Sequence, residues 1–541
     1  MPTMDRINKF IIVLLCMCLL MAGCEQANLK AEEETPSVTF VSMEDEAVLE
    51  YQVPKSSPHI LVDQLGYNSS SAKVAYFFGD EIPDEFLVKD IENDLTVFVG
   101  QLVNKGYSEE YEANIAYGDF SSLTKKGEYY VYADYLGSSY NFSIDDDIYD
   151  SLLDEASRTY YYNRCGMTLT EKNAGENAHN ACHTGKSVLR EDMNISLDVT
   201  GGWHQDATGS KDVEMAATTM ANMLLAYELF PETFSDDTNI PESGNGIPDI
   251  LDEIKYETDW LLKMQNPETG EVYSAVTYPA NTESDIKDKS SIVSYVEMSS
   301  LDSNRAFAFV MAKYSYIYQL FDVEYATTCL KAADRAWKYA LLKEKSDETA
   351  QYNPDWKMAA ASEIYRASGV KACEKELVEC FSAPEYFEGE FNMIKFFGWA
   401  AYINSKQKVN VELCNNAISV IMRNAEKISS ISRDAAFGVE GDKEQSNNQH
   451  ILDDMLVMTF VDYIITNHEY DTIIENNLHY FLGRNPMSIT YLDNVGTYNY
   501  MDVYEGLGLM KQFDSASKLI FMLGRINDEN VNTEGSGAVD N

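Results

Sequence analysis

The sequence predicts a mostly α-helical protein, in which a large toroid of helices follows a small β-sandwich. Residues 215–230 (MAATTMANMLLAYELF) are apolar on nearly every helical face, which is typical of a helix buried inside a large protein. From Tyr149 onward, apolar residues recur at helical spacing in successive segments, including 304–320, 327–341, 356–367 and 447–466. Helices joined by short links indicate an all-α toroid, because an α/β sheet would alternate them with strands.

A second helix follows the buried one. Residues 243–246 (SGNG) have turn chemistry, and Pro248 stands where a first helical residue needs no N–H donor. Apolar side chains then recur at helical spacing, at Ile250, Leu251, Ile254, Leu261 and Leu262. We therefore expect a helix with one buried stripe that begins at Pro248.

Residues 58–146 have the character of a β-sandwich. Four short runs are rich in branched and aromatic residues, at 60–62, 73–77, 95–99 and 128–132. Turn sequences separate them, for example GYNS at 66–69 and KKG at 125–127. This alternation predicts a sandwich of about 90 residues. A sandwich by itself implies no chemistry.

The chain is long and strongly acidic. It has 541 residues and a formal net charge of −47, from 41 basic and 88 acidic side chains. The length favours more than one domain. The charge excludes nucleic acid as a natural partner, because phosphate binding needs a positively charged surface.

The N-terminus predicts export. Residues 1–24 begin with Arg6 and Lys9, continue with an apolar run at 10–21, and end with Ala-Gly-Cys24. The small pair before Cys24 resembles a bacterial lipoprotein signal, which would make Cys24 the lipidated N-terminus on the outer face of a membrane. An ordinary secretory signal is the alternative. Residues 25–57 are acidic and predict a solvated linker.

The loop and helices around residues 201–265 resemble family 9 of the glycoside hydrolases. That family has a loop of the form GGW-x-DAGD-x-x-K, then an apolar helix, then ESGNGIPDLLDE…WLLKMQ. Residues 241–265 match the last phrase closely, and Gly201, Gly202, Trp203 and Lys211 match the loop. The loop departs from the pattern at QDATG, residues 205–209, where the family has its two-aspartate DAGD.

The resemblance extends over most of the chain. AAASEIYRASG at 359–369 and HYFLGRNP at 479–486 are similar to family phrases, and VDQLGY at 62–67 is similar to the immunoglobulin-like module that precedes many family 9 domains. It implies an immunoglobulin-like sandwich over 58–146 and an (α/α)6 barrel over 147–527. Residues 528–541 are expected to form a disordered tail.

Four residues form a candidate metal site: Cys165, Cys182, His183 and His204. Two cysteines and two histidines are a favoured set for tetrahedral zinc, and a site filled entirely by protein ligands is structural. The resemblance implies the same, since some family 9 enzymes hold zinc with this arrangement. A Cys165–Cys182 disulfide is the alternative, because export permits it, and His179 is a substitute ligand. No organic cofactor is expected.

Asp206 is the candidate catalytic base, with Asp212 as a weaker substitute. Inverting hydrolysis of a glycosidic bond, the mechanism of this family, needs one carboxylic acid to protonate the leaving oxygen. It also needs one carboxylate to activate water, about 6.5–9.5 Å away. Asp206 lies in the matching loop. The alternative is that Asp206 only caps a turn.

Glu505 is the candidate acid. The family carries its acid in a phrase before the last helix, and that glutamate position falls on Met510 here. The nearest upstream carboxylates are Glu505 and Asp502, and the segment 487–513 also contains Asp493. The alternative for Glu505 is a plain surface residue.

The predicted function is inverting hydrolysis of a β-linked glucan or related oligosaccharide by an exported, endoglucanase-like protein with a degenerate catalytic loop. Trp203, Tyr273 and Tyr278 are candidate sugar platforms, although in a chain with 36 tyrosines most must serve packing. One alternative is a non-catalytic glycan-binding lipoprotein on the same fold. A structural cell-surface protein that uses the sandwich for protein contacts is another.

Overall fold

The computed structural model describes residues 58–279, 293–347, 349–381, 385–439, 448–502 and 508–528. The predicted signal peptide with Cys24, the acidic linker and Glu505 lie outside the described residues. Among the helices of the described ranges, none is both long and apolar enough to cross a membrane.

Six helices of the described chain form an inner ring. They are α4 (Val213–Leu229), α6 (Leu301–Tyr318), α8 (Pro354–Ser368), α11 (Met393–Ile403), α13 (Asn448–Ile465) and α15 (Phe513–Ile526). Neighbours in the ring pack against each other from α4 to α11, and α15 packs on both α13 and α4. The Phe396 and Phe460 rings, 5.2 Å apart, connect α11 to α13. The largely apolar α4 is mostly buried, as its sequence predicts, although Met215 in its first turn is exposed.

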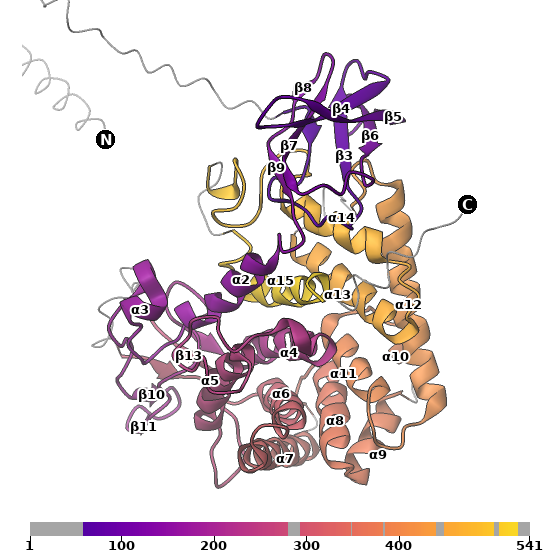
Figure 1. Cartoon of the computed structure of the whole chain (residues 1–541). Coiled ribbons are helices and arrows are strands. Elements are labelled where there is room, and N and C mark those ends of the chain that lie inside the picture. The colour runs from indigo at the N-terminus through magenta and orange to yellow at the C-terminus, as the bar shows by residue number, and fades with distance from the viewer. Residues whose placement is uncertain are drawn as a thin grey trace, which may run out of the picture. The chain divides into compact units, whose positions relative to one another are not determined.

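An outer layer covers this ring. It consists of α2 (Asp150–Tyr162), α5 (Asp249–Met264), α7 (Val323–Ser346), α9 (Lys371–Phe381), α12 (Val411–Asp434) and α14 (Asp471–Phe481). Each outer helix packs on an inner one: α2 on α15, α5 on α4, α7 on α6, α9 on α8, and both α12 and α14 on α13 (Figure 1). The predicted (α/α)6 architecture is confirmed. Helix α5 begins at Asp249, one residue later than predicted, because Pro248 has an extended ψ of 130°.

The inner helices α4, α6 and α8 run in the same direction. At one end, Trp356 Nε1 in the first turn of α8 donates to Glu214 in the first turn of α4, over 3.2 Å. Near the other end, Arg366 Nη1 and Lys313 Nζ both donate to Glu228 Oε2, over 3.1 and 3.2 Å. The amino termini of these helices therefore meet at one mouth of the barrel.

The β-sandwich precedes the helices. Its strands are β1 (Ile60–Leu61), β2 (Gly66–Tyr67), β3 (Val74–Gly79), β4 (Glu85–Asp90), β5 (Thr96–Ser108), β6 (Ala113–Asp119), β7 (Gly127–Ala133), β8 (Gly137–Ser138) and β9 (Phe142–Ile144). The long strand β5 pairs with β4 through its first half and with β6 through its second half. It thereby passes from one sheet to the other. The ring of Phe86 fills the core beside Gly100 and Gly118, where a Cβ atom would lie about 2.3–2.4 Å from it.

A small sheet supports the segment ahead of α4. It contains β10 (Ser187–Leu189), β11 (Ser196–Leu197), β12 (Lys211–Asp212), β13 (Ala275–Thr277) and β14 (Tyr295–Val296). The strand order is β11-β10-β14-β13-β12, and β12 pairs antiparallel with β13. This pairing fixes the backbone immediately before α4.

The first strands of the sandwich hold a loop from the far end of the chain. Gln64 Oε1 accepts hydrogen bonds from Thr497 N and Tyr498 N, over 2.9 and 3.0 Å. Its Nε2 donates to Ser488 O over 2.9 Å, and its backbone N–H donates to Leu482 O. Because Gln64 is only 6% exposed, these bonds are shielded from water. The loop at 488–498 is thus held by a sandwich residue.

Replacing Gln64 with Ala removes the side-chain bonds to the buried Ser488 carbonyl and to the partly buried N–H groups of Thr497 and Tyr498. Since a lost buried partner costs about 1–3 kcal/mol, we expect the free energy of unfolding to fall by at least ~2 kcal/mol in urea denaturation. Gln101→Ala, at an exposed position on β5, is the matched control and should change stability by less than about 0.5 kcal/mol. Equal stability of the two variants would contradict the role of Gln64.

Candidate functional site

The segment 205–212 forms a closed hairpin that leads into α4. Gln205 N donates to Ser210 O over 3.1 Å. The Gln205 side chain accepts from Asp212 N and donates to Asp212 O, over 2.6 and 2.9 Å. Asp212 then caps α4 by accepting from Met215 N over 2.9 Å. The hairpin is therefore fixed to the amino terminus of α4.

Asp206 lies on this hairpin with its side chain exposed to solvent. Its Oδ1 accepts hydrogen bonds from Thr208 N, Thr208 Oγ1 and Ser210 N, over 2.8, 2.6 and 3.0 Å. All three bonds go to Oδ1, and Oδ2 takes part in none of them. Asp206 thus caps its own turn and at the same time has a fixed orientation toward solvent.

The candidate acids Asp493 and Asp502 differ in their exposure to solvent. Asp493 is only 4% exposed, and its Oδ1 accepts from Gly508 N over 2.9 Å. Asp502 is exposed, and its Oδ2 accepts from Asn499 N over 2.9 Å. Met510, at the position predicted for the family acid, is buried and 2% exposed. The candidate acid Glu505 is not among the described residues.

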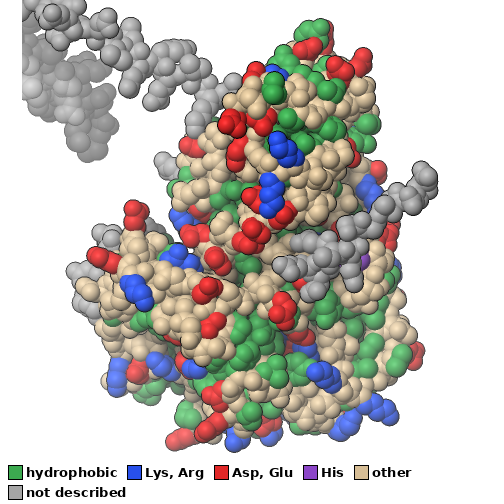
Figure 2. Space-filling view, viewed as in Figure 1, with side chains coloured by type: hydrophobic (Ala, Val, Ile, Leu, Met, Phe, Trp, Pro, Cys, Tyr) green, Lys and Arg blue, Asp and Glu red, His purple; other side chains and the backbone are tan. Residues whose placement is uncertain are grey.

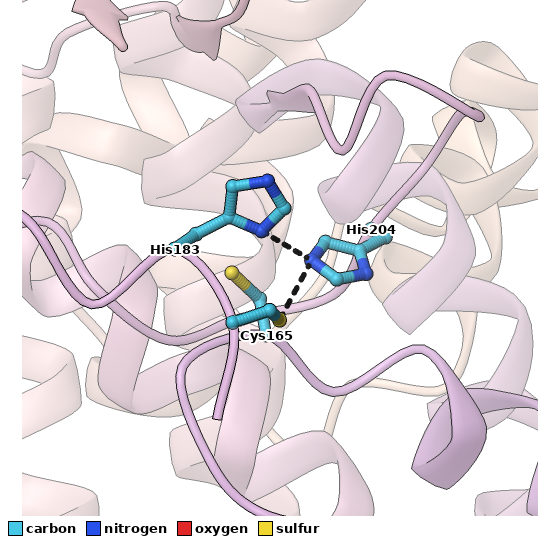
Figure 3. A group of neighbouring side chains, drawn as sticks. Cys165, His183 and His204 are labelled. Atoms are coloured by element: carbon cyan, nitrogen blue, oxygen red, sulfur yellow. Dashed lines mark hydrogen bonds between the residues drawn. The ribbon is translucent and has the colours of Figure 1, made fainter. Parts of the chain in front are cut away.

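The four predicted metal ligands come together. One ligand atom from each of Cys165, Cys182, His183 and His204 lies within 4.8 Å of the others, and all four residues are buried. His204 Nε2 is 3.1 Å from His183 Nδ1 and 3.5 Å from Cys182 Sγ (Figure 3). Both cysteines are free thiols, so the structure does not contain the alternative disulfide. The composition and spacing suit a bound metal ion.

The electrostatics of the cluster also suit a metal ion. Burial lowers the pKa of His204, which keeps its ring neutral as ligation requires. Contact with Cys182, and then the charge of Lys211, hold the pKa of Cys165 well below its usual range, whereas the same contact and burial raise the pKa of Cys182. Lys211 is 1% exposed, and its Nζ lies 3.7 Å from Cys165 Sγ and 2.7 Å from Gly201 O. Lys211 therefore faces the sulfur of one candidate ligand. The substitute ligand His179 is exposed and lies outside the cluster.

The cluster and the hairpin are in direct contact. His204 immediately precedes Gln205 in the chain. Gly209 has a φ of +85°, and a Cβ atom there would lie 2.8 Å from His183 Cε1. A side chain at this position would collide with the ring, so glycine is required both by its conformation and by its close approach. The metal-ligand cluster thus forms the support of the Asp206 hairpin.

The three aromatic candidates differ in exposure. Trp203 is fully buried, its ring lies 4.8 Å from that of Tyr160, and its Nε1 donates to Glu253 over 2.7 Å. It has no face open to a sugar, so the prediction that it is a stacking platform is wrong. Tyr273 and Tyr278 are half-buried, and the Tyr278 ring lies 4.4 Å from that of His183.

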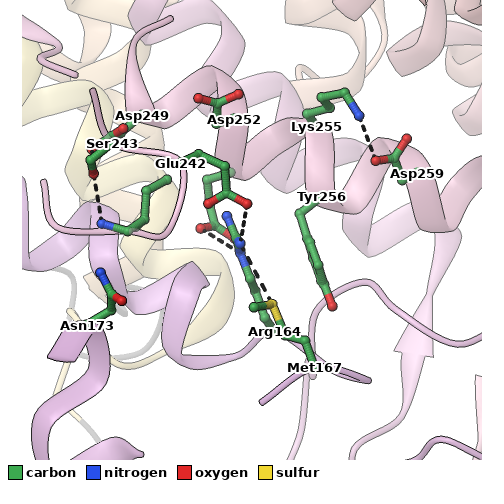
Figure 4. Close-up of polar contacts among 12 residues, drawn as sticks. Arg164, Met167, Asn173, Glu242, Ser243, Asp249, Asp252, Lys255, Tyr256 and Asp259 are labelled. Carbon is green, nitrogen blue, oxygen red and sulfur yellow. Dashed lines mark hydrogen bonds and ion pairs between the residues drawn. The ribbon is translucent and has the colours of Figure 1, made fainter. Parts of the chain in front are cut away.

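A buried ion pair fixes α5 beneath the loop, and the sequence did not single out its cation. Arg164 is fully buried, donates from Nε to Glu253 over 3.0 Å and from Nη1 to Glu242 over 3.0 Å, and stacks on Tyr256 (Figure 4). Asp249, an acidic residue of the SGNGIPDILDE phrase, serves internal bonding, since it accepts from Thr238 and Ser243.

Glu214 is a second residue that the sequence did not single out. It lies in the first turn of α4 and is half-buried beside the indole N–H of Trp356. Burial, and then the charges of Asp302 and Asp212, raise its pKa to about 7. The available signal was an isolated carboxylate at the start of an otherwise apolar helix.

Acidic side chains are spread over the visible face of the molecule and are not gathered in a single patch (Figure 2). With the net charge of −47, this surface suits a neutral ligand better than an anionic one.

Comparison with known proteins gives consistent matches. Residues 149–515 match the profile "Glycosyl hydrolase family 9", and residues 55–138 match "Cellulase N-terminal ig-like domain". The chain is 29% identical over 476 residues to a cellodextrinase of Butyrivibrio fibrisolvens, covering 81% of this chain and 85% of that protein. It is 26% identical over 489 residues to the xyloglucan-specific endo-beta-1,4-glucanase BoGH9A of Bacteroides ovatus, covering 81% of each.

Solved structures agree on the fold. A metagenome-derived family 9 endoglucanase superimposes with a TM-score of 0.76 at 22% identity, covering 87% of this chain and 99% of that one. A Zn-binding triple mutant of the family 9 endoglucanase J30 superimposes with a TM-score of 0.74 at 22% identity, covering 85% of this chain and 100% of that one. The two profile matches, with a fold that agrees, show that the chain belongs to glycosyl hydrolase family 9 and carries the immunoglobulin-like domain of cellulases at its N-terminal side.

Proposed function

We propose that this protein hydrolyses a β-linked glucan or a related oligosaccharide by an inverting mechanism, with Asp206 as the base. The orientation of Asp206 carries the proposal. Three donors hold its Oδ1, and the side chain is exposed on a hairpin fixed at both ends. A carboxylate in that position can accept a proton from water through Oδ2 while its turn remains intact. The named relatives act on β-linked glucans, which supports this substrate class.

A glycan-binding protein without catalysis is the second candidate. The observation that favours it is Met510, a buried apolar side chain at the position of the family acid. If no other carboxyl group protonates the leaving oxygen, the barrel binds sugar and does not cleave it.

We also propose that the cluster of Cys165, Cys182, His183 and His204 holds a structural zinc ion. Two thiolates and two imidazoles fill a tetrahedral site and leave no position for water. Zinc would supply folding energy here and would fix the hairpin through His204 and the contact of His183 with Gly209. The Zn-binding mutant among the similar structures supports the choice of metal.

Export and membrane anchoring are proposed from the sequence alone. Arg6, the apolar run at 10–21 and Cys24 support a lipoprotein signal. A lipid on Cys24 would retain the enzyme at the outer face of a membrane, where polymeric substrate is present.

Replacing Asp206 with Asn should lower reducing-sugar release from β-glucans by at least about 100-fold, since Asn cannot accept the proton. Binding should change little: the variant should be retained on insoluble glucan in a pull-down to about the same extent as wild type. Asp198→Asn is the matched control, because exposed Asp198 makes the same turn with Thr200. Binding by wild-type protein without turnover on any β-glucan would favour the second candidate.

Purified protein should contain about one zinc ion per chain. Cys182→Ser should abolish the zinc signal in elemental analysis and lower the thermal midpoint, because metal binding contributes to folding. Cys380→Ser, at a half-buried cysteine outside the cluster, should retain the zinc. A wild-type protein without zinc, or with a Cys165–Cys182 disulfide, would refute the assignment.

Wild-type protein expressed in a bacterial host should enter the detergent phase on phase separation, and Cys24→Ala should move it to the aqueous phase, because the lipid supplies the membrane affinity. Cys18→Ala, within the same signal, is the control and should stay in the detergent phase. Aqueous wild-type protein would eliminate the anchor.

A further inference from the structure

Glu214 lies at one mouth of the barrel and is partly exposed to solvent. The amino termini of α4, α6 and α8 meet at one mouth, and Glu214 lies there in the first turn of α4. Its neighbour Met215 is 43% exposed, so this turn reaches solvent. Glu214 itself is half-buried, with its Oε2 accepting from Trp356 Nε1 over 3.2 Å. A half-buried carboxyl group placed against an indole has the environment of a general acid.

The surroundings favour the protonated form of Glu214. Burial acts first, and the charges of Asp302 on α6 and of Asp212, the N-cap of α4, add to it, raising the pKa to about 7. The Trp356 N–H acts in the opposite direction. The cations on the other helices packed against α4 have partners of their own: Lys518 of α15 pairs with Asp453 and Asp514, and Lys263 of α5 donates to Thr200 O.

The hairpin brings Asp206 and Glu214 into the same region. Asp206 follows Gln205, which bonds both the N–H and the carbonyl of Asp212, and Glu214 lies two residues after Asp212. Both carboxylates therefore belong to one junction between the hairpin and α4. An inverting pair needs carboxyl groups about 6.5–9.5 Å apart, with the sugar and a water between them.

We infer that Glu214 is the general acid of this protein, in place of the glutamate that the family carries before its last helix. The inference rests on the proposed hydrolysis of a β-linked glucan. Glu214 gives its proton to the glycosidic oxygen as the bond from that oxygen to the anomeric carbon breaks. Water forms the new bond to that carbon and transfers a proton to Asp206. Solvent then returns a proton to Glu214 and removes one from Asp206.

The first test compares two substrates that differ in their need for an acid. Glu214→Gln should lower hydrolysis of unactivated β-glucan by about 100-fold or more. The same variant should hydrolyse 2,4-dinitrophenyl β-cellobioside within a few-fold of wild type, because that leaving group departs without protonation. This second substrate also reports that the variant is folded. Glu232→Gln, at an exposed glutamate on the 3-10 turn that follows α4, is the control and should match wild type on both.

The second test uses the pH profile, which a merely structural role would not move. Glu214 is protonated below its pKa, so activity should fall as pH rises through about 7. Asp302→Asn removes a neighbouring negative charge and should shift this alkaline limb to lower pH. Trp356→Phe removes the donor that stabilises the carboxylate and should shift it to higher pH.

The outcomes distinguish a failure of the proposed hydrolysis from a failure of Glu214 as its acid. Wild-type protein inert on both substrates would refute the proposed hydrolysis, and with it the acid. Active wild-type protein whose Glu214→Gln variant retains β-glucan hydrolysis would overturn the role of Glu214 alone. An equal loss on both substrates, or an alkaline limb unmoved in Asp302→Asn and Trp356→Phe, would overturn it as well.

Discussion

The arrangement of the site depends on one short hairpin that is fixed at both ends. At its start, His204 belongs to the buried cluster of thiols and imidazoles. At its end, Asp212 caps α4 and exchanges two bonds with Gln205. Gly209, pressed against His183, prevents the middle of the hairpin from moving toward the cluster. Asp206 is therefore held in place by the hairpin, although its side chain is exposed to solvent.

Two sets of contacts in the barrel domain support this hairpin. The small sheet pairs β12 with β13 directly ahead of α4, and the ion pair of Arg164 with Glu253 binds α5 below the loop. Glu253 also accepts from the indole of Trp203, which precedes His204. Charged groups this deeply buried are retained only when they are paired. Their pairing here joins the loop, an outer helix and the cluster into one unit.

Periodicity and residue type were sufficient for most of the fold. The all-round apolar α4, the toroid and the sandwich follow from spacing, and the metal-ligand cluster follows from the choice of two cysteines and two histidines. What the sequence could not supply was the direction of single side chains. Trp203 is an aromatic residue in the right loop, but its ring is enclosed by Tyr160 and Phe513. Glu214 resembles an ordinary helix-start charge until Trp356, from a helix far along the chain, is placed beside it.

The hydrogen bonds between Gln64 and the loop at 488–498 also bear on the order in which parts of the chain fold. Its partners Ser488 and Tyr498 lie 424 and 434 positions further along the chain. Contacts between segments so distant form late, because a long intervening chain must first be ordered. A ribosome would have to make nearly the whole polypeptide before the loop at 488–498 could be seated. Until then, the first strands would present unpaired polar groups to any chaperone that holds the nascent chain.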